Sequence, residues 1–193
     1  MTANNPYRNI IESQKPELTK ARRAMQEAYL KLSREKAFSD ISVKRLCETA
    51  QVARTTFYAN YMNTDDLLAE IEDALICDLL KVNENMCSIR SRQESTNKYN
   101  ENMMRFIREH HWELHILLVE QPDNRLLNKW KVAVKFHFFE ILTKEEQENS
   151  GFVLEILASM AVGAYTWLLD HPDEFNPEQV SKILQDSIKA LEY

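Results

Sequence analysis

Residues 42–68, SVKRLCETAQVARTTFYANYMNTDDLL, decide the fold of this 193-residue chain. Ser42 is a favourable N-cap, because its hydroxyl can accept a hydrogen bond from an unpaired amide in the first turn of a helix. Val43, Leu46 and Ala50 then recur at spacings of three and four, which is the pattern of one buried helical face. The sequence therefore predicts a short helix that ends near Ala50.

A second short helix is expected from about Arg54, after a tight turn. Phe57 and Tyr61 are four residues apart and fall on its inner face. The same register leaves a polar outer face that consists of Arg54, Thr55, Thr56, Tyr58 and Asn60. Guanidinium, hydroxyl and amide groups bind the phosphates and base edges of duplex DNA. The pattern is typical of a helix-turn-helix, and an ordinary helical hairpin with a solvated polar face is the alternative.

Residues 19–68 resemble the N-terminal DNA-binding domain of TetR-family transcriptional regulators. The resemblance rests on positions in all the helices expected there, namely Ala24, Ala28, Phe38, Ser42, Val43, Ala50, residues 56–58 (TFY), Tyr61 and residues 66–68 (DLL). Ala37 and Gln51 stand where the family has glycine, and Thr64 replaces a lysine that commonly contacts phosphate. Gln51 needs a left-handed backbone if the turn geometry is kept.

The resemblance implies an all-α fold of about nine helices. We expect a flexible arm over residues 1–18, a three-helix DNA-binding head over residues 19–66, and a ligand-binding and dimerisation body over residues 67–193. The implied function is binding of a palindromic operator by a homodimer, usually as a repressor that an effector in the body releases. The residues that match the family's DNA-binding face are Ser42, Val43, Arg54, Thr55, Thr56, Tyr58, Ala59, Asn60 and Thr64.

The distribution of charge agrees with this division. The formal net charge is −6, but residues 1–61 hold 11 of the 24 basic and 6 of the 30 acidic residues, a net charge of +5. The remaining residues have 13 basic and 24 acidic side chains, a net charge of −11. A basic head on an acidic body is the asymmetry expected when only the head meets phosphate.

The composition favours a soluble helical protein of the cytoplasm. The chain has only two glycines and five prolines, and it lacks long alternating runs of β-branched residues. No stretch approaches the ~18 uninterrupted apolar residues of a membrane span, and no signal peptide is recognisable. Cys47, Cys77 and Cys87 lack metal-ligand spacing and are interpreted as reduced thiols.

Apolar spacing predicts the remaining helices. We expect helices over residues 19–36, 63–82, 98–110, 112–120, 126–142, 151–170 and 177–191, with a loop over 88–97 and a polar connector over 144–150. The helix over residues 151–170 is apolar around much of its circumference, as a helix buried on two sides should be. We therefore predict that it forms the homodimer interface together with the final helix.

The aromatic and methionine side chains of the body can either fill its core or line an apolar effector cavity. We predict such a cavity between the helices over residues 98–110, 126–142 and 151–170. The expected lining consists of Met103, Phe106, His110, Trp130, Val134, Phe138, Met160 and Trp167.

No enzymatic motif is recognisable, and no cofactor or metal is predicted. His111 and His115 are four residues apart with Glu113 between them, but the sequence HWELH does not match the zinc-protease pattern. Two alternative functions remain. The protein is either an activator of the same family type that responds to a protein partner, or a helical small-molecule-binding or enzymatic protein whose head contacts another protein.

Overall fold

The computed structural model describes residues 6–7, 18–84, 92–148 and 150–174, and four single positions near the C-terminus. The described residues are helical and contain no strand, which confirms the all-α prediction. The predicted arm over residues 1–18 and the predicted final helix over residues 177–191 lie mostly outside the described residues. The elements are α1 (Lys20–Ser33), η2 (Phe38–Asp40), α2 (Val43–Ala50), α3 (Arg54–Tyr58), α4 (Thr64–Val82), α5 (Arg92–Glu109), α6 (His111–His115), η4 (Ile116–Glu120), α7 (Asn124–Ile141), α8 (Lys144–Glu148), α9 (Gly151–Asp170) and η5 (Pro172–Glu174).

Side-chain caps begin α1, α2 and α4. The Thr19 hydroxyl accepts a hydrogen bond from the Arg22 amide at 3.2 Å, and the Ser42 hydroxyl accepts one from the Arg45 amide at 3.3 Å. Asn63 caps α4 by accepting from the Asp66 amide at 2.9 Å. These caps satisfy amides that have no partner inside the helix, and so they fix where each helix starts.

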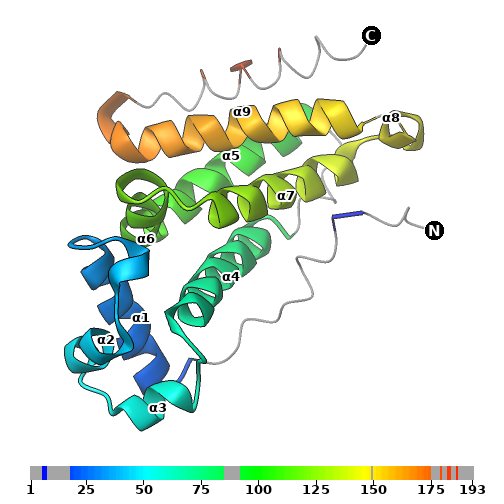
Figure 1. The fold of residues 1–193 in the computed structure, drawn as a ribbon. Helices are drawn as coiled ribbons and strands as arrows, with labels where there is room; N and C mark the ends of the chain where they lie inside the picture. The colour runs from blue at the N-terminus through cyan, green and yellow to red at the C-terminus, as the bar shows by residue number, and fades with distance from the viewer. Residues whose placement is uncertain are drawn as a thin grey trace.

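The head and the body occupy opposite ends of the molecule, and α4 runs between them (Figure 1). Inside the head, α1 packs against α2 and α4, while α2 packs against α3. Leu46 and Phe57 are fully buried between these helices. In the body, α7 and α9 lie side by side, and α4 contacts both α5 and α7.

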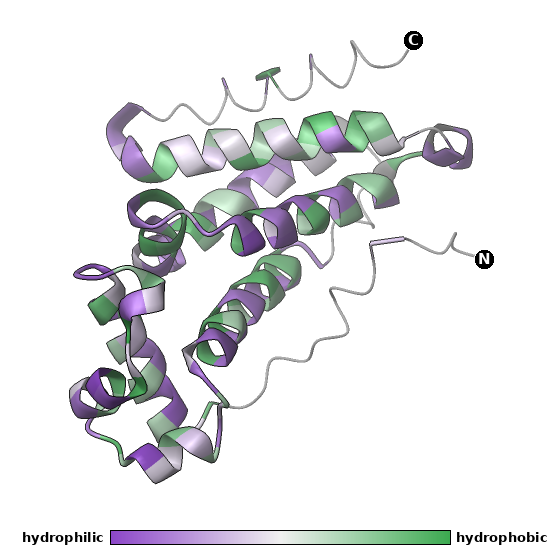
Figure 2. Ribbon diagram, in the orientation of Figure 1, coloured by the Kyte–Doolittle hydropathy of each residue, from purple (hydrophilic) through white to green (hydrophobic). Residues whose placement is uncertain are grey.

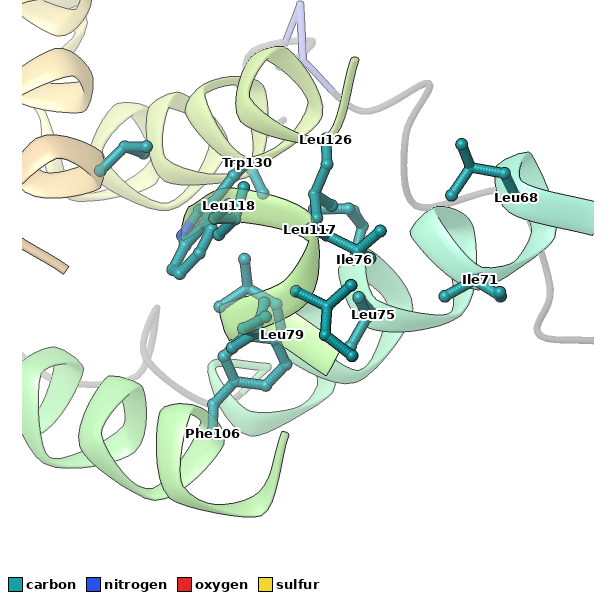
Figure 3. Close-up of a cluster of buried hydrophobic side chains, with 14 of the residues drawn as sticks. Leu68, Ile71, Leu75, Ile76, Leu79, Phe106, Leu117, Leu118, Leu126 and Trp130 are labelled. Atoms are coloured by element: carbon teal, nitrogen blue, oxygen red, sulfur yellow. The ribbon is translucent and has the colours of Figure 1, made fainter. Parts of the chain in front are cut away.

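The main core of the body forms around α4. Figure 3 shows Leu75 and Leu79 of α4 beside Phe106 of α5, Leu117 of the η4 segment and Trp130 of α7. All five side chains are buried.

Coloured by hydropathy, α4 carries an apolar face and a polar face, whereas α9 is apolar over most of its length (Figure 2). The helix α9 has the length and hydropathy of a membrane span, and one of its sides is buried against α7 and α6.

Three predicted boundaries in the body are wrong. Helix α5 begins at Arg92, within the segment expected to be a loop, because Ser95 and Thr96 are buried by tertiary packing in spite of their polarity. The expected connector over residues 144–150 contains the short helix α8, whose sequence KEEQE consists of good helix formers. The helix expected over residues 112–120 is divided into α6 and the π-helical turn η4.

Gln51 adopts the left-handed conformation that the turn was expected to require, with φ 55° and ψ 40°. We predict that Gln51→Gly stabilises the protein by about 1 kcal/mol, because glycine enters this region without a steric penalty. Urea denaturation measures the change. Gln51→Ala is the matched control and should give no such gain, and a destabilising Gln51→Gly would contradict the interpretation.

Candidate nucleic-acid interface

Helix α3 presents a polar outer face on two buried aromatic anchors. Phe57 and Tyr61 are buried with their ring centroids 5.5 Å apart, and they hold the helix against α2. The side chains of Arg54, Thr55 and Asn60 are exposed, as predicted. Because the anchors come from the same turns as the exposed residues, the direction of the outer face is fixed by the head's own core.

The remaining residues of the predicted DNA-binding set divide into exposed and half-buried positions. Tyr58 is 60% exposed, and its ring packs edge-on against Phe57 at 5.4 Å. The Asn60 side-chain amide donates to the Thr56 carbonyl at 2.7 Å, which restricts its orientation. Ser42 and Ala59 are exposed, whereas Val43, Thr56 and Thr64 are half-buried.

The start of α4 is acidic at the position where the family resemblance predicts a phosphate contact. Thr64 stands there, followed by Asp65 and Asp66 in the first turn. The Asp66 carboxylate accepts from the Met62 amide at 2.9 Å, so it completes the cap of the helix. The Asp65 carboxylate lies 3.6 Å from Arg125 of the body. These carboxylates repel phosphate, so α2 and α3 are the better candidates for most backbone contacts to DNA.

Gln121 of the body joins the head through three hydrogen bonds. Its side-chain oxygen accepts from the Phe38 amide at 3.1 Å. Its side-chain nitrogen donates to the Lys36 carbonyl at 2.6 Å and also to the Ser33 carbonyl. These carbonyls lie at and just after the end of α1, where helix carbonyls lack partners of their own. One body residue therefore caps the first helix of the head, a contact that the sequence did not reveal.

A buried carboxylate connects α4 to α7. Glu72 of α4 is fully buried, and its carboxylate accepts from the Lys129 ammonium at 2.8 Å. The Arg125 guanidinium lies 3.1 Å from the other oxygen of Glu72. Lys129 also donates to Asp73 at 2.6 Å. Burial raises the pKa of Glu72 to about 7, since desolvation outweighs the attraction of Lys129.

The residues predicted to line an effector cavity do not all point inward. Met103, Phe106, Trp130, Val134 and Phe138 are buried on α5 and α7, while His110 and Met160 are half-buried. Trp167 is 48% exposed and stacks on His171, with ring centroids 4.4 Å apart. The expectation for Trp167 is therefore wrong, because it falls on the face of α9 that points away from the core.

The histidines of α6 have ordinary partners. The rings of His111 and His115 stack 5.7 Å apart, and His115 Nδ1 lies 3.2 Å from a Glu120 carboxylate oxygen. Within the part of the chain that the structure describes, no group of three His, Cys, Asp or Glu side chains is arranged to hold a metal ion.

No protein-family model matches this chain, and no curated protein matches it. Several solved structures match this chain in fold. The fatty acid degradation regulator FadR from Bacillus halodurans aligns with a TM-score of 0.67 at 12% identity, over 92% of this chain and 100% of that one. A TetR-family regulator, PfmR from Thermus thermophilus, gives a TM-score of 0.57 at 15% identity, over 85% and 90% of the two chains. The dihydroxyacetone kinase operon activator DhaS gives 0.53 at 17% identity, over 89% and 93%. The protein therefore has the fold of TetR-type transcriptional regulators.

The buried carboxylate of Glu72 generates a prediction about pH. In the folded protein Glu72 keeps its proton up to a pKa of about 7, whereas in the unfolded chain it loses the proton at its ordinary pKa of 4.5. The contribution of Glu72 to the free energy of unfolding is therefore fully present below pH 4.5 and is lost as the pH rises to about 7. The lowered pKa of His137, about 4, acts in the opposite direction, so the wild-type profile alone does not isolate Glu72. We therefore expect Glu72→Gln to gain stability relative to the wild type as the pH rises from 5 to 8.

Urea unfolding of both proteins across this pH range measures the difference. Glu101→Gln is the control, because Glu101 forms an exposed pair with Lys98 at 3.1 Å. The difference between this variant and the wild type should stay constant with pH. A constant difference for Glu72→Gln as well would contradict the assignment.

Proposed function

We propose that this protein is a DNA-binding transcriptional regulator that binds a palindromic operator as a homodimer. The observation that carries the proposal is the exposed polar face of α3, held on the buried side chains of Phe57 and Tyr61. In a helix-turn-helix the second helix enters the major groove, and its side chains reach the base edges. The similarity in fold to transcriptional regulators supports the same function for this chain.

Arg54, Thr55 and Thr56 are assigned to the major groove in this proposal. Ser42, Val43, Tyr58, Ala59, Asn60 and Thr64 are assigned to the DNA backbone or its immediate vicinity. Lys44 and Arg45 of α2 are also exposed, so they add positive charge to the same helix pair. This charge supports association with phosphate, whereas the polar face of α3 supports the choice of sequence. Such a protein acts where the DNA is, in the cytoplasm.

The homodimer is proposed to form on the exposed face of α9. Phe152 is 75% exposed and Trp167 is 48% exposed, which is unusual for large apolar side chains on a packed helix. Gly163 falls between them on the same face, and nothing lies within 4 Å of the position that a side chain would occupy there. A small residue between two large apolar ones allows a second helix to approach closely. Leu157, by contrast, is buried within the protomer and does not belong to this surface.

The effector is proposed to bind inside the body and to alter the placement of the heads. The two heads of a dimer must reach successive major grooves, about 34 Å apart, so a small displacement weakens binding. Gln121, which precedes α7, accepts a hydrogen bond from Phe38 of the head. Lys129 of α7 donates a hydrogen bond to Glu72 of α4. Repression is the first candidate for the sign of regulation. Activation is the second, and the similarity to the operon activator DhaS favours it.

The DNA-binding proposal is tested on an operator selected from random duplexes. Arg54→Ala should weaken operator binding by about 1–3 kcal/mol and relax the choice of base at one position, because a guanidinium that forks onto guanine is lost. Arg105→Ala on α5 of the body is the matched control and should leave binding unchanged. Gel shifts at several salt concentrations measure both effects. Binding that does not weaken with salt would contradict the proposal, since phosphate contacts release counterions.

The dimer proposal predicts that Trp167→Glu produces monomers. A buried charge without a partner destabilises an apolar interface strongly. Trp112→Glu is the control, because Trp112 is a similarly exposed tryptophan, 41% accessible, on α6. Light scattering at micromolar concentration should give a dimer mass for the wild type and the control. A wild-type particle of monomer mass would exclude this interface.

A further inference from the structure

Two buried carboxyl groups meet where α4 passes the start of α7. Glu72 of α4 is fully buried, and Asp123, the N-cap of α7, is 8% exposed. Glu72 Oε2 accepts a hydrogen bond from the Lys129 ammonium at 2.8 Å. Asp123 Oδ1 accepts one from the Arg125 amide, also at 2.8 Å. The other two oxygens, Glu72 Oε1 and Asp123 Oδ2, are buried and accept no hydrogen bond from a donor among the described residues.

Only a proton can join these two oxygens. Glu72 and Asp123 are placed for a hydrogen bond between their side chains. Ionised carboxylate oxygens accept and do not donate, so a hydrogen bond between two of them requires that one carboxyl group keeps its proton. Two ionised carboxylates in one buried site would repel each other, and a single shared proton removes that repulsion.

The surrounding charges leave room for this proton. Four carboxylates face two cations in a junction cluster that consists of Asp65, Glu72, Asp73, Asp123, Arg125 and Lys129. The Lys129 ammonium is divided between Glu72 and Asp73, at 2.8 and 2.6 Å. The Arg125 guanidinium lies 3.1 Å from Glu72 Oε1 without the alignment of a hydrogen bond, and its side chain is 46% exposed. Because acids outnumber bases in the cluster, a proton on the buried pair lowers its excess negative charge.

The junction cluster lies where the head meets the body. Tyr29 of α1 belongs to the head and is buried. Burial raises the pKa of Tyr29, and the charges of Asp65 and Arg125 also act on it, so its phenol faces the cluster. Asp123 follows Gln121 by two residues, and Gln121 caps the end of α1. A change in the distance between the two carboxyl groups therefore moves α4 relative to the segment that holds α1.

We propose that one proton shared by Glu72 and Asp123 is a pH-sensitive switch that sets the placement of the head on the body. With the proton in place, the two groups hold α4 against the start of α7. When the proton is lost, the two negative charges repel and this contact opens. A fixed head placement loses less entropy when both heads of a dimer dock on one operator, so the closed form binds DNA more tightly. This inference rests on the proposed function, because it describes how that DNA binding is regulated.

The pH range of the switch follows from the two states of Glu72. In the closed form Glu72 keeps its proton up to a pKa of about 7, because it is buried, whereas in the open form it ionises at its ordinary pKa of 4.5. The preference for the closed form therefore falls as the pH rises from 4.5 to about 7 and is constant above that range. One linked proton changes this preference by at most about 10-fold for each pH unit. We expect operator binding by the wild type to weaken about 5- to 10-fold from about pH 5 to about pH 8.

An NMR titration of the Glu72 side-chain carboxyl carbon tests the shared proton without DNA. The midpoint for the wild type should lie near 7. Asp123→Asn replaces the second acid by an amide that donates to Glu72, so the midpoint should fall by about one pH unit or more. Asparagine also serves as an N-cap, so the start of α7 is kept. Glu101→Gln is the control and should leave the midpoint unchanged, because Glu101 forms an exposed pair with Lys98.

Gel shifts with the selected operator across the same pH range test the regulation. Glu72→Gln and Asp123→Asn each replace the shared proton by an amide hydrogen that stays in place at any pH. Both variants should bind the operator about 5- to 10-fold more tightly than the wild type at about pH 8, and equally well at about pH 5. A structural defect would weaken binding, so tighter binding separates the switch from damage to the fold. Glu101→Gln should follow the wild type at every pH.

Three results would overturn the inference. They are a Glu72 midpoint near 4.5 in the wild type, a midpoint that Asp123→Asn leaves unchanged, and a ratio of variant to wild-type operator affinity that is the same at every pH. The two measurements also keep the proposals distinct. A shared proton in a protein that does not bind DNA would refute the proposed function, and with it the regulatory role, but not the proton pair. Operator binding with an ordinary Glu72 midpoint would refute the switch alone.

Discussion

Helix α4 must bury apolar side chains at both of its ends, and the arrangement of the molecule depends on that requirement. Leu67 and Leu68 are buried near its start, where α4 packs against α1 of the head. Leu75 and Leu79 are buried further along, where it meets α5 and α7 of the body. Because one rigid helix belongs to both cores, the head cannot move relative to the body without disturbing the packing of α4.

Polar contacts then select one placement of this helix. Glu70 of α4 pairs with Arg22 of α1 at 2.7 Å and accepts from Gln26 at 3.0 Å, which fixes the end of α4 inside the head. Glu72 faces the other way, toward Lys129 of α7. Such directional contacts have two discrete states, formed and broken. A helix held in this way can transmit a change in the body to the head.

The body combines two kinds of buried polar group, and the difference has a physical meaning. Paired groups such as Tyr165 and Asn100 contribute to the fold in the free protein. Unpaired groups such as Tyr99 and His137 reduce its stability. A protein that retains such groups in its core has given up stability there, which is the pattern expected where a core also serves a function.

The sequence by itself determined the head. Its helices are short, their caps are local, and the contacts that orient α3 come from Phe57 and Tyr61 within the same two turns, so residue spacing was sufficient to predict the exposed face. It also predicted the left-handed backbone at Gln51 and the extent of α9, which His171 and Pro172 end. Local interactions decide these features, and local interactions are visible in a sequence.

Only the tertiary structure decided the rest. The buried start of α5 at polar residues, the capping of α1 by Gln121 and the pairing of Glu72 with Lys129 all join positions that are far apart in the chain. The exposed side of α9 was equally undetermined, because its helix is apolar nearly all round and only its packing against α7 and α6 shows that Trp167 points outward. Periodicity gives the faces of a helix, but the partner that covers each face is a property of the assembled fold.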